Sequence, residues 1–260
     1  MLAKMRILFR SRDLLWEWTN RNISARYQQS ALGWLWAVIQ PAAQVAVFAF
    51  IFTLVVPVNT ERTPYVMFSY VAIVPWTFLA ASLTDMSNSL VDNMMLITKI
   101  YFPREILPFA AMLARLMDFA VAAGLIVVML IVYRIPISLT GLLYLPLILA
   151  IQLVLVLGLG LASAAANVFF RDVRSLILLG LQLWFYASPI IYPASLVPDT
   201  LRSLYYINPM VGILESYRNV LLYDRLPSPY LGLSAAVALV ILFLGYAFFN
   251  RVEFQFADII

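Results

Sequence analysis

Long hydrophobic runs alternate with short polar segments along most of this 260-residue chain. A transmembrane helix needs about 20 mainly apolar residues, and the pattern predicts six such spans. They are residues 34–56, 65–83, 109–133, 142–168, 176–191 and 231–249. The runs are continuous instead of alternating every second residue, which favours a helical bundle over a β-barrel. The predicted fold class is therefore an all-α polytopic membrane protein with one domain, residues 1–260.

Composition supports this prediction and excludes several kinds of chemistry. The chain is 64% hydrophobic and 12% charged, whereas a soluble domain carries about 25% charged residues. It has no Cys and no His, which excludes disulfides, thiol nucleophiles, haem ligands and nearly every zinc geometry. We predict no catalytic residue and no metal ligand. Neither Lys4 nor Lys99 ends a GxxxxGK motif, so energy from ATP would have to come from another chain.

Positive charge predicts the orientation, because Lys and Arg near span ends stay in the cytoplasm. The segment before the first span carries Lys4, Arg6, Arg10, Arg12, Arg21 and Arg26. We therefore expect a cytoplasmic N-terminus, and six spans return the tail, residues 250–260, to the cytoplasm. The loop at residues 192–230 falls outside despite its arginines, since long loops follow the charge bias poorly.

Residues 1–33 predict a cytoplasmic interface helix. Polar residues recur at helical spacing on one face, and apolar residues lie on the other, which is typical of a helix in the membrane interface. The polar face is Asp13, Glu17, Asn20 and Ser24, and the apolar face is Leu14, Leu15, Trp18 and Ala25. Gly33 then permits a bend into the first span, where Trp34 and Trp36 lie at headgroup level. This corner is either an aromatic anchor or a groove for a lipid-linked cargo.

Two segments are candidates for contact with another protein. Residues 88–99 predict a short cytoplasmic helix whose methionine-rich face suits docking, although the same pattern fits a helix on the bilayer surface. The candidate coupling residues there are Asp92, Asn93, Met94, Met95 and Leu96. The second segment is the short loop with Arg171 and Asp172, which charge alone marks only as a cytoplasmic loop.

Prolines divide the outside loop, residues 192–230, into two amphipathic pieces too short to span, 196–207 and 210–223. Asn208 and Pro209 supply an N-cap and a first helical residue for the second piece. We expect a re-entrant extracytoplasmic hairpin between spans five and six, either as a pore lid or as a plain cap. Such a segment needs protein or water around its free backbone groups.

Two features lie inside the predicted spans. Arg115 and Asp118 are three residues apart in the third span, so they share a face and either pair structurally or line a conduit. Gly158, Ala162 and Ala166 are spaced by four in the fourth span, a pattern that allows close helix packing.

The whole chain resembles the membrane subunits of ABC exporters that move lipid-linked polysaccharides, the O-antigen and teichoic-acid permeases. The resemblance is carried by an ordered set of short motifs. They are Arg26-Tyr27, residues 30–36 with Pro41, residues 102–108 (FPREILP), 170–173 (FRDV), 188–193 (SPIIYP), 208–210 (NPM) and 256–258 (FAD).

The resemblance implies a homodimer that forms one channel in the cytoplasmic (inner) membrane of a bacterium. It implies no nucleic-acid partner. Two ATP-binding-cassette ATPase subunits would dock on residues 88–99 and 171–174 and hold MgATP, so this chain would need no cofactor. The cargo would be polysaccharide on undecaprenyl diphosphate, entering beside the interface helix and leaving past the hairpin. Aromatic rings suit sugar passage, and Trp76 is a further candidate.

From these considerations we predict two sets of site residues. The lipid-headgroup entry set is Arg26, Tyr27, Trp34 and Trp36, in which the Arg26 guanidinium suits phosphate oxygens. The channel or gate set is Arg115, Asp118, Tyr186, Tyr192, Tyr205 and Tyr206.

Three other functions fit less well. The first is an ABC permease for a drug or a lipid, which the sequence separates poorly from a polysaccharide permease. The second is a membrane-embedded glycan- or lipid-processing enzyme, but such enzymes usually need clustered acids with a metal or a His base. The third, a scaffold, leaves Arg115 and Asp118 unexplained.

Overall fold

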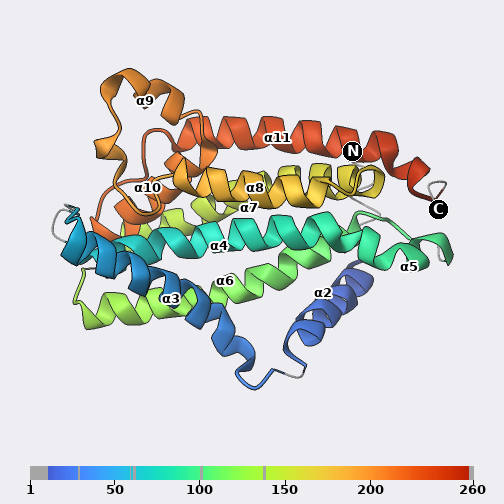
Figure 1. The fold of residues 1–260 in the computed structure, drawn as a ribbon, viewed down its shortest axis with the longest axis horizontal. Helices are drawn as coiled ribbons and strands as arrows, with labels where there is room; N and C mark the ends of the chain where they lie inside the picture. Colours follow the sequence, from blue (N-terminus) through green and yellow to red (C-terminus); the bar gives the residue numbers. More distant parts are fainter. Residues whose placement is uncertain are drawn as a thin grey trace.

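The computed structural model describes residues 11–28, 30–58, 60, 63–99, 102–136 and 139–257. Every regular element in these residues is helical, which confirms the predicted all-α class (Figure 1). Lys4, Arg6, Arg10 and Asp258 lie outside the described residues. The elements in chain order are α2 (Arg12–Tyr27), η1 (Gly33–Leu35), α3 (Trp36–Phe50), η2 (Ile51–Val55, a π-helical turn), α4 (Tyr65–Ser89), η3 (Val91–Asn93), α5 (Met94–Lys99), α6 (Ile106–Val132), α7 (Leu139–Phe169), α8 (Val173–Tyr186), η4 (Ala194–Leu196), α9 (Asp199–Tyr205), α10 (Pro209–Leu222), α11 (Leu231–Val252) and η5 (Glu253–Ala257).

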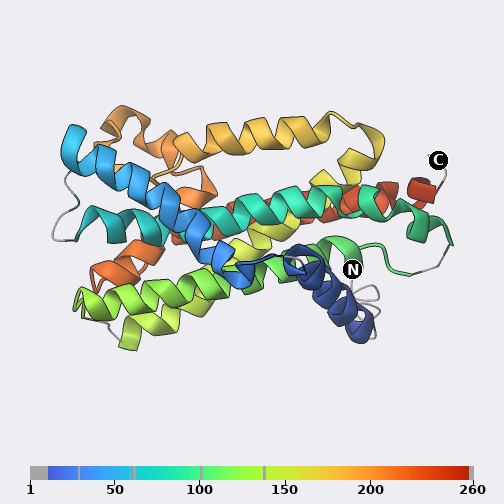
Figure 2. The same cartoon turned by 60° about the horizontal axis from the view of Figure 1, so that its bottom comes forward.

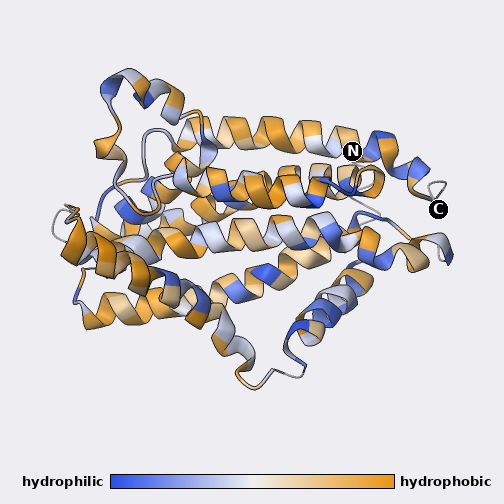
Figure 3. Cartoon of the chain, in the orientation of Figure 1, coloured by the Kyte–Doolittle hydropathy of each residue, from blue (hydrophilic) through white to orange (hydrophobic). Residues whose placement is uncertain are grey.

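Five helical segments of the described chain are long and apolar enough to cross a membrane. They are Gly33–Val55, Tyr65–Lys99, Ile106–Val132, Gly141–Phe169 and Leu231–Phe256. Figure 3 shows these segments as predominantly hydrophobic, whereas α2 is largely hydrophilic. Five predicted spans are therefore confirmed. The predicted span at residues 176–191 corresponds to α8, an apolar helix of 14 residues that is shorter than the other five.

Helix α4 occupies the centre of the bundle. It packs against α3, α6, α7, α8 and α10, and Figures 1 and 2 show neighbours around it in both views. Its apolar residues cover every side, so the helix buries surface in all directions. Met67, Ile73 and Leu79 are fully buried. The predicted end of this span at residue 83 is too early, because the helix continues for one and a half turns to Ser89.

Helices α7 and α11 cross at two glycines. A Cβ on Gly158 would overlap the backbone of Leu242, and one on Gly245 would overlap the carbonyl of Gly158. The close approach therefore requires residues without a side chain at this crossing. Gly158 of the predicted small-residue pattern is thus confirmed as a packing position, and the helix it meets is α11 of the same chain.

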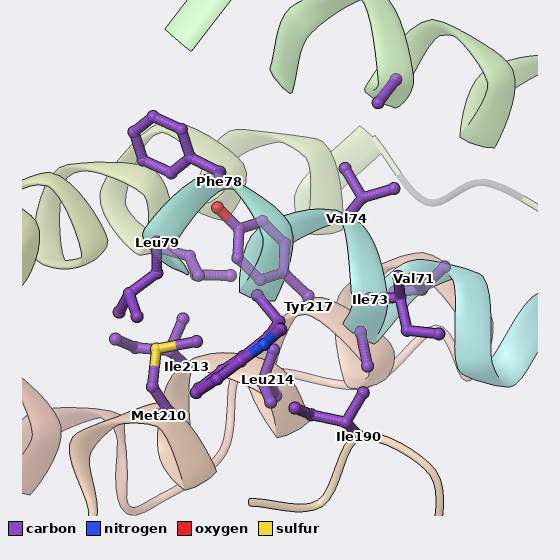
Figure 4. Close-up of a cluster of buried hydrophobic side chains, with 14 of the residues drawn as sticks. Val71, Ile73, Val74, Phe78, Leu79, Ile190, Met210, Ile213, Leu214 and Tyr217 are labelled. Carbon is purple, nitrogen blue, oxygen red and sulfur yellow. The ribbon is translucent and has the colours of Figure 1, made fainter. Parts of the chain in front are cut away.

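Helix α10 is buried among α4, α7 and α11. The side chain of Asn208 accepts a hydrogen bond from the backbone N–H of Met210 at 3.0 Å, with Pro209 as the first helical residue. This confirms the cap predicted from the sequence. Figure 4 shows Tyr217 of α10 packed against Val74 and Phe78 of α4. Helix α9, which precedes α10 in the chain, projects from the same end of the bundle (Figure 1).

The two ends of the bundle carry different elements. Helix α5, the turn after α7 and η5 lie at one end, here called the α5 end, and α9 lies at the opposite α9 end (Figure 1). A separate hydrophobic cluster closes the α5 end, where Leu90, Leu107 and Phe256 are buried. Phe256 contacts the rings of Phe169 and Phe249, so η5 fastens the end of α11 to α7.

Candidate functional site

The chain bends sharply between α2 and α3. Gly33 has φ 48°, a left-handed conformation that glycine adopts without strain, and its N–H donates to the Ser30 hydroxyl at 3.0 Å. The rings of Tyr27 and Trp34 stack across the bend with centroids 5.0 Å apart. The prediction that Gly33 permits the bend is therefore confirmed. Trp34 and Trp36 are exposed.

The face of α2 that meets the bundle differs partly from the predicted apolar face. Trp18 packs against the cluster at the α5 end, and Thr19 is buried with its hydroxyl donating to the Leu15 carbonyl at 2.7 Å. Leu14 and Ala25 are exposed and do not pack against the bundle. Arg26, at the end of α2, is directed toward two carboxylates of the bundle.

These contacts form what we call the charge ring: Arg26, Asp85, Arg115 and Asp118, from α2, α4 and α6. Arg26 Nη1 lies 2.5 Å from Asp118 Oδ2, and Arg26 Nη2 lies 2.7 Å from Asp85 Oδ2. Arg115 bridges the same two carboxylates, with Nε 2.6 Å from Asp85 Oδ2 and Nη1 3.3 Å from Asp118 Oδ2. The Tyr27 hydroxyl adds a hydrogen bond of 2.6 Å to Asp118 Oδ1. The predicted pairing of Arg115 with Asp118 is confirmed.

The charge ring is neutral as a whole, and its side chains are between 14% and 26% exposed. Partly buried charges in this arrangement depend on one another, since removing one partner leaves another without compensation. Burial, followed by the hydrogen bond to Asp118, raises the pKa of Tyr27 to about 12, so its hydroxyl remains a donor at neutral pH.

Sequence reasoning missed Asp85 as a site residue and gave Arg26 a different partner. Asp85 lies just beyond the predicted end of the second span at residue 83, whereas α4 carries it on its last turns inside the bundle. Arg26 lies 92 residues from Asp118 in sequence, and no local pattern links them. One signal was available, namely that Asp85 is the first charged residue after a long apolar run.

A cavity of about 510 Å³ lies beside the charge ring, between α3, α4, α6 and α8. Its lining combines charge-ring side chains, aromatic rings, glutamines and small apolar residues. The main members are Arg26, Tyr27, Trp36, Gln40, Gln44, Trp76, Thr77, Phe78, Thr84, Arg115, Asp118 and Leu181. An adjoining hollow of about 280 Å³ shares Gln44, Trp76 and Leu181 and continues to Phe48, Gln182, Phe185 and Tyr186. We call the two together the α3–α8 cavity.

The structure divides the predicted gate tyrosines. Tyr186 lines the α3–α8 cavity, and its backbone carbonyl accepts a hydrogen bond of 2.9 Å from the Tyr192 hydroxyl. The Tyr205 hydroxyl donates to the Tyr192 hydroxyl at 3.3 Å. Tyr206 instead stacks on Tyr230 with ring centroids 3.6 Å apart and is largely buried. Hydrogen bonds thus connect Tyr186, Tyr192 and Tyr205 into one group. Among the described residues, Tyr206 has no hydrogen bond to these three.

The predicted coupling residues lie at the α5 end. Met95 is 79% exposed, whereas Met94 packs partly against the hydrophobic cluster there. Asn93 accepts a hydrogen bond from Arg21 Nη1 at 3.3 Å and donates to the Ser89 carbonyl at 2.8 Å, so it connects α2 to the end of α4. Asp92 is exposed and Leu96 is half-buried.

The second predicted contact segment lies at the same end of the bundle (Figure 1). Arg171 and Asp172 are exposed in the turn between α7 and α8. Sequence reasoning missed Phe170 beside them as an exposed apolar residue, although it is 69% exposed.

Arg218 of α10 is a buried cation that sequence reasoning counted only as loop charge. Its guanidinium donates to three backbone carbonyls, those of Phe68 (3.2 Å), Pro189 (2.5 Å) and Ile190 (2.7 Å). The guanidinium carbon also lies 3.5 Å from the centre of the Phe68 ring. Burial lowers the pKa of Arg218 to about 10, which still leaves it cationic at neutral pH. It fastens the turn after α8 to α4.

The sequence matches the family described as ABC-2 type transporter over residues 13–222. An O-antigen export system permease protein RfbA from Myxococcus xanthus is 33% identical over 262 residues, which cover 99% of both chains. A protein of the same name from Klebsiella pneumoniae is 30% identical over 248 residues, or 95% of both chains. The polysialic acid transport protein KpsM from Escherichia coli is 24% identical over 238 residues, covering 90% of this chain and 91% of KpsM.

Proposed function

The chain belongs to the ABC-2 type transporter family, and on that premise we propose that it is the channel-forming permease subunit of an ATP-driven exporter of undecaprenyl-diphosphate-linked polysaccharide. The relatives are named as export permeases, which confirms the resemblance stated from the sequence. The chain is therefore a transport subunit and not an enzyme. The two RfbA proteins are named for O-antigen and KpsM for polysialic acid, and the lipid-linked form of the cargo is part of our proposal.

The observation that carries the proposal is the α3–α8 cavity. Polar side chains at membrane depth are costly unless they meet protein or water, yet this cavity gathers Gln40, Gln44 and the charge ring between apolar helices. Trp36 and Phe185 supply ring surfaces beside them, and Trp76, which is 6% exposed, also borders the cavity. A mixture of rings and hydrogen-bonding groups suits sugars, which present apolar faces and hydroxyls.

The direction of the chain supports six crossings with both termini in the cytoplasm. Helix α7 ends at the α5 end, and α11 starts at the α9 end (Figure 1). The chain must therefore run the length of the bundle between them, and α8 with the turn after it makes this passage. Helix α10 would then belong to a re-entrant hairpin, supported by its burial among three spans. Arg218 of α10 also donates to the Pro189 and Ile190 carbonyls in the turn after α8, so this non-helical backbone is covered by protein, as it must be at membrane depth.

The bend between α2 and α3 is the proposed entrance for the lipid headgroup. Arg26 and Tyr27 line the cavity mouth with Trp36, and Trp34 stacks on Tyr27. A diphosphate that binds Arg26 must take it from Asp85 and Asp118, so headgroup entry would open the charge ring. Two copies of the chain would complete the channel, with the exposed apolar residues Val47 and Phe50 of α3 facing lipid or the second copy.

Two ATPase subunits carrying MgATP would dock at the α5 end. The exposed Met95 and the turn with Phe170 and Arg171 lie there together. Met95→Asp should abolish co-purification of the ATPase, because it places a charge in an apolar contact, while membrane insertion is unchanged. Leu204→Asp, at an exposed position of α9, is the matched control. Equal co-purification by the two variants would contradict this docking surface.

Complementation tests the proposed function as a whole. A bacterial strain that lacks its own O-antigen permease would receive this chain together with a cognate ATP-binding-cassette ATPase. We expect polysaccharide to reach the cell surface, as measured with an antibody against the glycan. Glycan that stays in the cytoplasm at normal membrane abundance of the chain would contradict the proposal. Transport of a drug or of a free lipid instead would favour the alternative permease.

A further inference from the structure

The three glutamines of the α3–α8 cavity are exposed, whereas Gln152 of α7 is buried in the bundle. Gln152 of α7 is fully satisfied, because its Nε2 donates to the Pro75 carbonyl at 2.8 Å and its Oε1 accepts from the Tyr217 hydroxyl at 3.1 Å. Gln40, Gln44 and Gln182 make no side-chain hydrogen bond within the described part of the chain. All three residues are exposed and line the cavity.

The position of these amides makes their lack of partners significant. Gln44 lies about 16 Å along the helical segment from Gly33, near the middle of a hydrocarbon core of about 30 Å. Gln40 precedes it by one turn on the same face of α3. An amide without a partner in hydrocarbon costs several kcal/mol, about what one or two good hydrogen bonds supply. These side chains therefore need a polar occupant of the cavity.

The charges around the cavity indicate the chemistry of that occupant. Its charged lining residues in the described chain are Arg26, Arg115 and Asp118, and both arginines are already bridged by two carboxylates. No unpaired cation faces Gln44 or Gln182 in this lining. The hydrogen-bonding groups beyond the charge ring are neutral amides, each with both a donor and an acceptor. The hydroxyl groups of uncharged sugar units can bind both the donor and the acceptor of each amide.

We propose that Gln40, Gln44 and Gln182 form a binding site for uncharged sugar units, in which their amides bind sugar hydroxyls while Trp76 and Phe185 contact the sugar faces. This rests on the proposed function, and it adds a substrate class and three binding residues to it. Trp76 is well placed because it lines both parts of the cavity and is held edge-on by Trp184 and Phe185. Successive sugar units would exchange hydrogen bonds with the amides as the chain passes.

Site-specific labelling tests this assignment. The chain has no Cys, so Gln44→Cys introduces a single thiol. A water-soluble maleimide should label it in cells that do not make the glycan, and labelling should be at least about fivefold slower while glycan is exported. Val47→Cys, at an exposed position of α3 that does not line the cavity, is the control and should stay unlabelled. Equal labelling of Gln44→Cys with and without glycan, or none at all, would overturn the proposal.

Export by amide-free variants provides the second measurement. Methionine keeps the length of glutamine without its hydrogen bonds, so Gln40→Met/Gln44→Met/Gln182→Met should lower surface glycan about fivefold or more at matched membrane abundance. If the triple variant does not accumulate, each single variant should lower export about twofold. Undiminished export would overturn the proposal, as would loss of self-association in the triple variant, which would place the amides between two copies. Failure of the unmodified chain to export would instead contradict the proposed function.

Discussion

Arginines hold two parts of the bundle in different ways. In the charge ring, near the entrance, every guanidinium has carboxylate partners and about a quarter of its side chain is exposed. At the α9 end, Arg218 is 3% exposed and is held by three backbone carbonyls. Carbonyls of a folded backbone cannot leave without unfolding the turn, whereas a carboxylate on a side chain can exchange its partner. The comparison indicates a fixed α9 end and an exchangeable contact at the entrance.

Arg218→Met should have the largest effect, because it removes the donor of three hydrogen bonds to buried carbonyls. We expect the free energy of unfolding to fall by about 3 kcal/mol or more, measured as thermal unfolding of the purified protein in detergent. Arg202→Met is the control, since the Arg202 side chain is 43% exposed on α9 and forms an ion pair with Asp199 of the same helix. If both variants are equally stable, the carbonyl contacts of Arg218 do not hold this end.

Asp118→Asn should come next, because it removes the carboxylate shared by Arg26, Arg115 and Tyr27. We expect a loss of about 2 kcal/mol in the free energy of unfolding. The double variant Arg26→Gln/Asp118→Asn restores neutrality and should lose less than the sum of the two single variants. Strict additivity would show that the charge ring does not act as a unit.

The sequence predicted the helical class, five spans, the bend at Gly33 and the Asn208 cap, because each depends on residues close together in the chain. It also predicted the pairing of Arg115 with Asp118, which share one helix face. It could not predict the closure of the ring by Arg26 and Asp85, since those contacts depend on how α2 and α4 pack. The partners of Arg218 were inaccessible for the same reason, because backbone carbonyls leave no pattern in a sequence.

Arg26→Lys tests whether the contact of Arg26 with Asp85 and Asp118 depends on the shape of the guanidinium as well as on its charge. One ammonium cannot bridge Asp85 and Asp118 as the guanidinium does, so export should fall about threefold, whereas Arg26→Gln should lower it about tenfold. Surface polysaccharide at matched membrane abundance provides the measurement. Normal export by Arg26→Gln would contradict the proposed entrance and leave Trp34 and Trp36 as membrane anchors.

Tyr27→Phe should have the smallest effect, because it removes the hydrogen bond to Asp118 and keeps the ring that stacks on Trp34. We expect a loss of about 1 kcal/mol in the free energy of unfolding. The raised pKa of Tyr27 keeps its hydroxyl protonated. Its contribution is therefore complete below pH 10 and is lost only as the pH rises toward 12. The difference between variant and unmodified protein should accordingly be constant from pH 6 to 9, and a change within that window would contradict this contact.

Photo-crosslinking tests most directly the claim that the α3–α8 cavity conducts the polysaccharide. A photoreactive phenylalanine analogue at Trp76 lies in both parts of the cavity, and the same analogue at Val47 lies outside it. Illumination of cells during export should join glycan to the chain from position 76, detected with an antibody against the glycan, and not from position 47. Export at the normal rate without any adduct from position 76 would show that the polysaccharide takes another path.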